Sequence, residues 1–330
     1  MSAGAPLFTF GVIADVQYAD LEDGSNFART RTRYYRNSLQ LLRKAREHWS
    51  GSAVRPEFVL QLGDLIDGFN ALHGASRSAL DTVLREFRSG VVDEVHHVWG
   101  NHELYNFSRE ELLTSELNST LHVKRRLGEC CPGADIYAYS FSPQPGFTFI
   151  VLDAYDMSLL GLEESSEQYQ SALRLIQMYN SHQDLNSPPT PTESEPLLQR
   201  YAKFNGGFSQ EQLDWLDSVL SSADDRQEKV TIVSHLPVHP DSTDPACLAW
   251  NHGALLGLLR RHCSVVLFMA GHDHDGGYCY DPESGVHHLT LAGVIETPPH
   301  SQAFGSVCVY PDRMELTGHG RISSQVLNFS

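Results

Sequence analysis

Polar side chains of metal-binding types follow five separate apolar segments of this chain. Each apolar segment has the length of a single buried strand, and each polar cluster stands where the chain would turn out of a sheet. Functional sites in open α/β sheets assemble at the carboxyl ends of strands. The five clusters are Asp15-Val16-Gln17, Gly63-Asp64, Gly100-Asn101-His102-Glu103, Ser234-His235 and Gly271-His272-Asp273-His274. This pattern predicts a layered α/β fold in which several strand ends share one site.

The spacing of apolar residues predicts the elements that carry these clusters. Helical spacing of leucine and other apolar residues predicts helices over 29–48, 76–89, 209–220 and 246–261. Apolar runs predict strands over 7–15, 58–64, 95–99, 230–234 and 265–270, a hairpin of 136–142 with 147–153, and short strands at 278–280, 286–292 and 306–310. Ser209 and Gln212 form a capping-box pattern at a helix start. The alternation of strand and helix is typical of layered α/β folds.

A chain of 330 residues is long enough for one large α/β domain. We expect a single domain over residues 1–330, with a Pro/Ser-rich excursion at about 156–207. Part of this excursion, residues 186–196, reads NSPPTPTESEP and predicts a flexible segment. Residues 186–207, taken with Leu197 and Phe208, are either a lid or a disordered insertion without a role.

Seven of the strand-end residues offer the oxygen and nitrogen ligands that Mn²⁺, Mg²⁺, Fe and Zn²⁺ accept, without the thiolates of a structural zinc site. They are Asp15, Gln17, Asp64, Asn101, His235, His272 and His274. Seven ligands are too many for one tetrahedral ion, but they fit two ions that share a bridging carboxylate. A two-metal site clamps the attacking and leaving oxygens of an in-line displacement.

Each cluster alone has an ordinary structural explanation. A Gly-Asp pair after a strand commonly forms a turn, and an Asn-His pair commonly caps a helix or lies on the surface. The GHDH cluster is harder to explain in this way, because His272 and His274 at i and i+2 of an extended segment face the same side. The five clusters in this order and at these positions indicate a metal site together.

In this order the motifs resemble those of the calcineurin-like metallophosphoesterase superfamily, whose pattern is D-x-H, GD, GNH, H and GHxH. The match spans Asp15 to His274, most of the chain. The resemblance implies a four-layer α/β/β/α sandwich, with two mixed β-sheets flanked by helices. More narrowly, the chain is similar to a manganese-dependent group that hydrolyses ADP-ribose and CDP-alcohols. That similarity lies in FGVIADVQYAD, QLGDLIDG, VWGNHELYN, NGGFSQEQLDWL, SHLPVHP and VVLFMAGHDHDGGY.

The resemblance also implies a role for each strand-end residue. Asp64 would bridge two divalent cations, with Mn²⁺ preferred and Mg²⁺, Zn²⁺ or Fe as alternatives. The residues that complete the two sites would be Asp15 and His274 for the first, and Asn101, His235 and His272 for the second. His102 would be the catalytic residue that is not a ligand: it either protonates the leaving oxygen or stabilises charge at the phosphorus.

Two positions depart from common superfamily patterns. Gln17 stands where the common pattern has His, and an amide oxygen is a harder and weaker ligand than imidazole. Gln17 is therefore either an oxygen or outer ligand that biases the first site toward Mn²⁺ or Mg²⁺, or that site binds its ion loosely. The protein phosphatases of the superfamily carry an Arg shortly after the GD motif, whereas this chain reads GDLIDGFN. Without that bidentate Arg, phosphoprotein substrates are disfavoured.

The implied reaction is hydrolysis of the diphosphate linkage in ADP-ribose and in CDP-choline, CDP-ethanolamine or CDP-glycerol. A hydroxide activated by two metal ions would attack one phosphorus, giving AMP or CMP and a phosphorylated product. Glu103 either orients His102 or caps a turn, and Asp67 is either an outer partner of the site or the N-terminal acid of a helix.

Aromatic and polar residues near the motifs are candidates for nucleoside binding. They are Phe27, Tyr18, Tyr105, Tyr278, Asn251, His252 and Cys247. Phe27 follows the first motif and lies on a loop before a helix, so it is placed to reach the cleft. Cys247 is either a pocket-lining thiol or a small buried hydrophobe.

Composition limits the partners of the chain. With 24 Lys and Arg against 41 Asp and Glu, the formal net charge is −17, which argues against a nucleic-acid binder. Two divalent ions would still make the local field positive enough for a small anionic substrate.

The N-terminus lacks a signal-peptide pattern and the longest apolar run, Val265–Ala270, is too short to span a membrane. None of the 6 cysteines forms a CxxC pair. We expect a cytoplasmic monomer with a small nucleoside diphosphate substrate and no nucleic-acid or membrane partner.

Two other functions stay open at this point. One is a cyclic-nucleotide phosphodiesterase of the same superfamily, which uses the same two-metal chemistry. The other is a binding scaffold that keeps the fold without catalysis, although the complete ligand set weighs against it.

Overall fold

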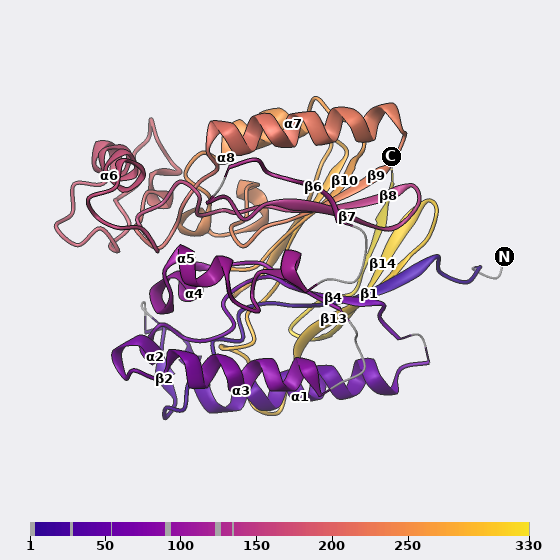
Figure 1. The fold of residues 1–330 in the computed structure, drawn as a ribbon, viewed down its shortest axis with the longest axis horizontal. Helices are drawn as coiled ribbons and strands as arrows, with labels where there is room; N and C mark the ends of the chain where they lie inside the picture. Colours follow the sequence, from indigo (N-terminus) through magenta and orange to yellow (C-terminus); the bar gives the residue numbers. More distant parts are fainter. Residues whose placement is uncertain are drawn as a thin grey trace.

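Two β-sheets pack face to face in the computed structural model, and helices cover the outer face of each sheet (Figure 1). The structure describes residues 4–26, 29–53, 55–89, 94–122, 127–133 and 135–329. Helices α1 and α3 lie along one side of the molecule, and α7 and α8 lie along the other (Figure 1). The predicted four-layer α/β/β/α arrangement is therefore confirmed.

The first sheet has the order β15-β14-β13-β1-β4-β5. Strand β1 pairs in parallel with β4 and antiparallel with β13, so the sheet is mixed. Its strands are β1 (Phe8–Ile13), β4 (Phe58–Gln61), β5 (Val95–His97), β13 (Ala303–Val309), β14 (Arg313–Gly320) and β15 (Gln325–Asn328). Strands β14 and β15 were not predicted, because their alternating exposure gives no continuous apolar run.

The second sheet has the order β11-β12-β10-β9-β8-β7-β6. Strands β8, β9, β10 and β12 pair in parallel, and β7 joins β8 as the predicted hairpin. The strands are β6 (Leu127–Cys130), β7 (Tyr139–Gln144), β8 (Phe147–Val151), β9 (Lys229–Val233), β10 (Val265–Ala270), β11 (Gly277–Asp281) and β12 (Val286–Thr290). A separate two-stranded ribbon pairs β2 (Gly24–Ser25) with β3 (Thr32–Arg33).

The helices connect these strands. They are α1 (Tyr35–Gly51), α2 (Phe69–Leu72), α3 (Ser76–Arg88), α4 (Asn101–Asn106), α5 (Arg109–Leu113), α6 (Glu167–Tyr179), α7 (Gln210–Asp225) and α8 (His252–Leu259). Short 3₁₀ helices are η1 (Ser119–Leu121), η2 (Leu198–Arg200), η3 (Pro240–Ser242) and η4 (Pro245–Cys247). Among the described residues, no helix is both long and apolar enough to cross a membrane.

Aromatic side chains fill the space between the sheets. Phe10 and Phe58 of the first sheet each meet Phe149 of the second edge to face, with ring centroids 5.3 Å apart. Edge-to-face pairs add specific geometry to the large apolar area that each ring buries. On the outer face of the first sheet, Trp49 of α1 lies over Gly11, and a Cβ at Gly11 would stand 2.8 Å from the indole. These contacts hold the strands whose ends carry the polar clusters.

Two predicted helix starts are wrong. The predicted helix at 29–48 begins only at Tyr35, because β3 pairs with β2 and Tyr34 donates its N–H to the Ile295 carbonyl. The predicted helix at 246–261 begins at His252, because the Trp250 N–H bonds across the fold to the Gly206 carbonyl. In both segments long-range backbone bonds override local helical spacing.

Residues 156–207 form a protrusion at one end of the molecule, with α6 at its outer side (Figure 1). Helix α6 was not predicted. Residues 186–196 contain no helix or strand. The protrusion has its own small core, in which Ile176 and Tyr201 pack against Trp250. The two ends of the protrusion meet, since Met157 and Gly207 pair as a β-bridge.

The capping-box prediction at α7 is half right. The Ser209 hydroxyl accepts the Gln212 N–H at 3.2 Å and donates to the Asp156 carboxylate at 2.6 Å. The Gln212 side chain does not return to the cap residue. It bonds instead with the backbone of Asp153, whose N–H lies 2.9 Å from Gln212 Oε1.

Removing the Ser209 hydroxyl should lower the free energy of unfolding by about 1–2 kcal/mol, because a helix cap and a bond to a buried carboxylate are both lost. Urea unfolding of Ser209→Ala measures this change. Ser218→Ala is the matched control, since Ser218 lies exposed within the same helix. Equal unfolding midpoints for the two variants would contradict the assignment.

Candidate metal centre

The five predicted polar clusters meet at the carboxyl ends of β1, β4, β5, β9 and β10. The loops after these strands are joined by backbone bonds, so the clusters form one surface. The Asp15 N–H donates to the Gly63 carbonyl at 3.1 Å, and the Gln17 N–H donates to the Asp64 carbonyl at 2.8 Å. The Gly271 N–H donates to the His235 carbonyl at 3.0 Å, which links the last two clusters.

Backbone strain is concentrated at these loops. Six described residues other than glycine have a positive φ, and four of them are predicted ligands. Those four are Asp15 (54°), Gln17 (43°), Asp64 (59°) and His272 (69°). Such residues cost free energy and persist where the surrounding structure holds them, commonly at functional sites. The residues with a positive φ therefore lie in the same loops as the sequence motifs.

Glycine is needed beside two of the ligands because side chains pack against its backbone. A Cβ at Gly100 would lie 2.1 Å from Asp64 Oδ1. A Cβ at Gly63 would lie 2.2 Å from His235 Nδ1, and Gly63 also has a φ of +99°. The glycines of the GD and GNH motifs thus let ligand side chains approach from neighbouring strands.

Asp64 lies at the middle of the cluster and is 1% exposed. Its Oδ1 accepts the His102 backbone N–H at 2.8 Å. Its Oδ2 lies 3.2 Å from Gln17 Nε2 on one side and 3.4 Å from His235 Nε2 on the other. Burial alone raises the pKa of this carboxyl, but the nearby histidines outweigh burial, so the pKa lies well below its usual value. The Oδ2 atom of Asp64 therefore faces Gln17 of one half of the predicted ligands and His235 of the other half.

His235 and His272 turn their free ring nitrogens toward each other. His235 Nδ1 lies 2.7 Å from the Leu62 carbonyl, so Nδ1 carries a proton and Nε2 is the nitrogen that faces the cluster. His235 Nε2 lies 3.1 Å from His272 Nδ1 and 3.3 Å from Asn101 Oδ1. Burial lowers the pKa of His235, but the Asp64 charge outweighs it and raises that pKa to about 9. Burial and the His235 charge lower the pKa of His272. The Asp64 charge therefore favours a second proton on His235, at Nε2, and would equally favour a cation in place of that proton.

His274, Gln17 and Asp15 make the other half of the cluster. His274 Nδ1 lies 2.8 Å from Glu296 Oε1, which leaves Nε2 as the acceptor. His274 Nε2 lies 2.9 Å from Gln17 Nε2 and 3.6 Å from Asp15 Oδ1. Burial opposes protonation of His274, but the two carboxylates outweigh it and raise the pKa to about 9. The charges that favour a proton on His274 Nε2 would equally favour a cation in its place.

These residues fit divalent cations. The ligand atoms of Asp64, His235 and His272 all lie within 4.8 Å of one another. Gln17 Oε1 is buried and has no hydrogen-bond partner among the described residues, while its NH₂ group points at the lone pairs of Asp64 and His274. A half-turn of this amide would give the oxygen to a cation bound by those lone pairs. Oxygen and imidazole ligands in this number suit Mn²⁺, Fe or Zn²⁺.

His102 stands beside the ligands with a defined tautomer. Its Nδ1 accepts the Gly68 backbone N–H at 2.8 Å, so the proton is on Nε2. Nε2 lies 3.9 Å from Asp64 Oδ2. Burial is the main cause of a lowered pKa at His102, which keeps the ring neutral. Asp67 Oδ2 lies 3.4 Å from His102 Nδ1, so Asp67 is an outer neighbour of this ring.

The Glu103 carboxylate caps the backbone of the two turns. Oε2 accepts the N–H groups of Asp64 and Gly100, and Oε1 accepts that of Leu65, each at 2.7 Å. Burial and then the Asp64 charge raise the pKa of Glu103 to about 8, against these three donors. Of the two roles left open by the sequence, the structure gives Glu103 the cap, and this cap joins the GD turn to the GNH helix.

The predicted nucleoside-binding residues are spread around the cluster. Phe27 lies outside the described residues. Tyr105 packs edge to face on His102 with ring centroids 5.2 Å apart, and it is 36% exposed. Tyr18 and Cys247 are half-buried, the former beside the first motif and the latter in η4.

Three other candidates use their polar atoms within the protein. Asn251 bonds both ways with the Phe208 backbone, at 3.0 and 2.7 Å. His252 Nδ1 lies 3.2 Å from the Val238 carbonyl, and the Tyr278 hydroxyl lies 2.9 Å from His287. Phe208 itself is buried, whereas Leu197 is half-buried at the start of η2.

Four further residues reach the metal centre although none of them belongs to the five strand-end clusters. Glu296 holds His274, and the Tyr155 hydroxyl lies 3.2 Å from Asn101 Oδ1. Asn205 contacts His272 at 2.8 Å. The Arg33 guanidinium lies 3.7 Å from Asp67 and 3.5 Å from Glu296, and its buried Nε has no hydrogen-bond partner among the described residues. No Arg follows the GD motif in the sequence, but Arg33 brings a guanidinium to the same region of the fold. The only sequence signal for this residue is the arginine-rich run RTRYYR.

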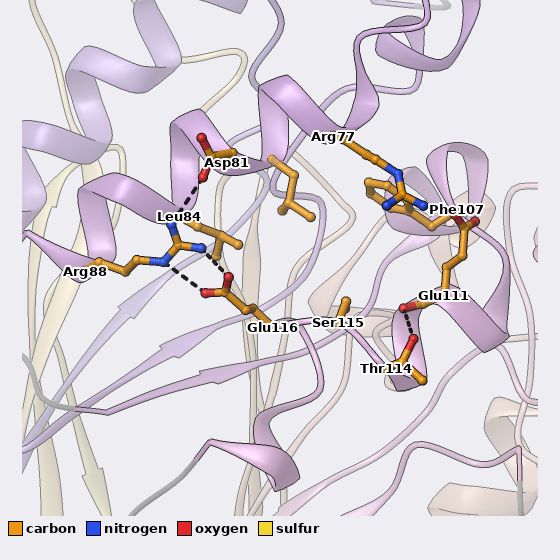
Figure 2. A pocket seen from close by; sticks show the side chains of 10 residues that line it. Arg77, Asp81, Leu84, Arg88, Phe107, Glu111, Thr114, Ser115 and Glu116 are labelled. Carbon is orange, nitrogen blue, oxygen red and sulfur yellow. Dashed lines mark hydrogen bonds and ion pairs between the residues drawn. The ribbon is translucent and has the colours of Figure 1, made fainter.

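A surface pocket of about 400 Å³ lies elsewhere, between α3 and the segment around α5 (Figure 2). Its charged side chains are paired with each other, Arg88 with Glu116 and Arg77 with Glu111. None of the five strand-end clusters lines this pocket. This pocket is therefore separate from the five polar clusters.

Comparisons with known proteins agree with this geometry. The family model described as calcineurin-like phosphoesterase matches residues 8–276. A zebrafish (Danio rerio) protein named manganese-dependent ADP-ribose/CDP-alcohol diphosphatase is 56% identical over 98% of this chain and 99% of its own length. The human protein of that name is 52% identical over 98% of this chain and 93% of its own length. The crystal structure of a dimetal phosphatase from Danio rerio superposes with a TM-score of 0.93, at 55% identity, covering 98% of this chain and all of that one (100%).

Proposed function

The chain belongs to the calcineurin-like phosphoesterase family, and on that basis we propose that it hydrolyses the diphosphate linkage of ADP-ribose and CDP-alcohols with two divalent cations, Mn²⁺ preferred. The products are AMP or CMP and a phosphorylated second product. The observation that carries the metal chemistry is the pair of free ring nitrogens, His235 Nε2 and His272 Nδ1, which face each other at 3.1 Å beside Asp64. The substrate class is supported by the names and high coverage of the relatives.

We assign the metal ligands from the two halves of the cluster. When bound, the two cations supply positive charge that lowers the pKa of water and neutralises phosphate oxygens. Asp64 presents Oδ2 to both halves. The ligands we assign to the first half are Asp15, Gln17 and His274, and those of the second half are Asn101, His235 and His272.

His102 acts on the substrate without being a ligand. Its Nε2–H is the free donor of a neutral ring, because Nδ1 is occupied by the Gly68 N–H. A neutral donor favours the role of charge stabilisation over full proton transfer, so His102 donates a hydrogen bond to a phosphate oxygen or to the leaving oxygen. Arg33 adds a guanidinium that can pair with phosphate oxygens. Glu103 keeps the backbone of both turns in place.

A product-resolved assay tests the substrate class. The metal-depleted protein is supplied with Mn²⁺ or Mg²⁺ and offered ADP-ribose, CDP-choline, CDP-glycerol and cyclic AMP in separate reactions. We expect AMP from ADP-ribose and CMP from the CDP-alcohols, faster with Mn²⁺. AMP released from cyclic AMP alone would identify a cyclic-nucleotide phosphodiesterase instead, and no product from any of them would favour a binding scaffold.

Replacing Gln17 by His should change the preference among metals. Imidazole is softer than an amide oxygen and suits Zn²⁺ better, so the ratio of activity with Mn²⁺ to activity with Zn²⁺ should fall on the order of tenfold. Metal titrations of Gln17→His measure this ratio. Gln210→His is the control, because Gln210 is exposed at the start of α7. An unchanged Mn²⁺ preference would show that the amide does not set it.

A further inference from the structure

Asn205 lies outside the five strand-end clusters, at the return of the 156–207 protrusion, and touches the proposed ligand His272. The Asn205 side chain is completely buried, at 0% exposed. Its Oδ1 lies 2.8 Å from His272 Nε2. Its Nδ2 donates to the carbonyl of Arg200 at 2.8 Å and to that of Ala246 at 2.6 Å.

These bonds determine which way the amide points. Both carbonyls can only accept, so they require the two hydrogens of the NH₂ group, and Oδ1 must face His272. His272 Nε2 must then carry the proton, because an amide oxygen cannot donate. The lone pair of the ring is left on Nδ1, the atom that lies 3.1 Å from His235 Nε2.

We propose that Asn205 is a positioning residue of the metal centre, which holds His272 in the one tautomer and ring orientation that presents Nδ1 to a cation. This inference rests on the proposed function, which makes His272 a ligand. Outer partners of this kind hold metal-bound histidines and tune their basicity. Without Asn205 Oδ1, the Nε2–H of the half-buried His272 loses this acceptor, and the ring gains freedom to turn or to move its proton to Nδ1.

The same amide also holds the protein chain together, so a test must separate the two roles. Through Arg200 and Ala246 it ties η2 and η4 to the centre. Asn205→Ala removes the acceptor for His272 and both donors. Asn205→Asp removes the two donors but keeps an acceptor for the His272 Nε2–H. If Asn205 has a purely structural role, both variants should lose Mn²⁺ affinity equally. If Asn205 positions His272, Asn205→Asp should keep its Mn²⁺ affinity and Asn205→Ala should lose it.

Asn180→Ala provides the matched control in the same protrusion. Asn180 is 1% exposed and its Nδ2 donates to three backbone carbonyls, including that of Tyr201 at 2.8 Å. None of its bonds reaches a proposed ligand. Loss of this amide should loosen the protrusion without changing His272.

The first measurement is Mn²⁺ affinity, from the electron paramagnetic resonance signal of free Mn²⁺ titrated against metal-depleted protein. We expect Asn205→Ala to weaken binding at one site by about 10–100-fold. Asn205→Asp and Asn180→Ala should stay within a few-fold of the unaltered protein. Equal weakening in the Ala and Asp variants of Asn205, or unchanged binding in Asn205→Ala, would overturn the proposal.

The second measurement needs no metal. The ¹⁵N shifts of labelled histidine report the tautomer of each ring, and we expect His272 to carry its proton on Nε2 in the unaltered protein and to lose this preference in Asn205→Ala. A proton on Nδ1 in the unaltered protein would overturn the inference. Asp64→Asn, titrated in the same experiment, tests the proposed function separately. If Asp64→Asn binds Mn²⁺ normally, the proposed metal centre is wrong. If Asp64→Asn loses Mn²⁺ binding but Asn205→Ala does not, only the positioning role of Asn205 is refuted.

Discussion

We expect Asp64→Asn to abolish tight binding of the second Mn²⁺ ion and to lower kcat/KM for ADP-ribose on the order of 10³-fold or more. The reason is that Asp64 Oδ2 faces Gln17 at 3.2 Å and His235 at 3.4 Å, so one charge serves both halves of the ligand set. Asn has nearly the same shape but no charge, and its NH₂ group cannot bind a cation. The backbone should be retained, because Asn also tolerates the positive φ of 59° found at this position.

Steady-state kinetics and a Mn²⁺ titration on the same preparation measure both effects. Asp20→Asn is the control, since the Asp20 side chain is 79% exposed and forms an ion pair with Arg36. It should leave kcat/KM and metal binding unchanged. If kcat/KM of Asp64→Asn for ADP-ribose lies within tenfold of that of the unaltered protein, the hypothesis that Asp64 serves both cations is wrong.

Glu103→Gln should lower the free energy of unfolding by about 2–3 kcal/mol and reduce activity as well. The Glu103 carboxylate accepts three backbone N–H groups, from Asp64, Leu65 and Gly100. A Gln side chain has one acceptor oxygen, so its NH₂ group must face at least one buried backbone N–H. Because two of the three donors belong to the GD turn, relaxation of that turn also moves the Asp64 carboxylate.

Denaturant unfolding without metal measures the stability change, and kcat measured with saturating Mn²⁺ measures the catalytic one. Glu111→Gln is the matched control, because Glu111 forms the same kind of capping box with Ser108 but is 44% exposed. Exposed substitutions of this kind stay within about 0.5 kcal/mol. A Glu103→Gln protein as stable as Glu111→Gln would contradict the role of the three N–H bonds.

Local sequence signals predicted the centre of this molecule well and its periphery less well. The strands β1, β4, β9 and β10 are rich in apolar residues and almost entirely buried, since both faces of each are covered, and such segments stand out in a sequence. Strands β14 and β15 have exposed positions and were missed. The starts of α1 and α8 were misplaced, because the bonds that delay them come from residues far along the chain.

The amino-acid sequence by itself determined which residues gather at the strand ends. A ligand that directly follows a buried strand has its position set by that strand, and parallel neighbours in a sheet bring their ends together. The structure places all seven predicted ligands in one connected cluster. The sequence also contains the glycines that let those side chains approach, such as Gly100 beside Asp64.

Only the tertiary structure decided how each ligand is held. The proton positions on His235, His272 and His274 follow from partners at Leu62, Asn205 and Glu296, which are remote in the chain. No local spacing encodes such partners, because a hydrogen bond between side chains requires only that the fold bring two atoms within reach. The set of predicted ligands can therefore be read from the sequence, whereas the tautomers and orientations of their side chains are set by packing.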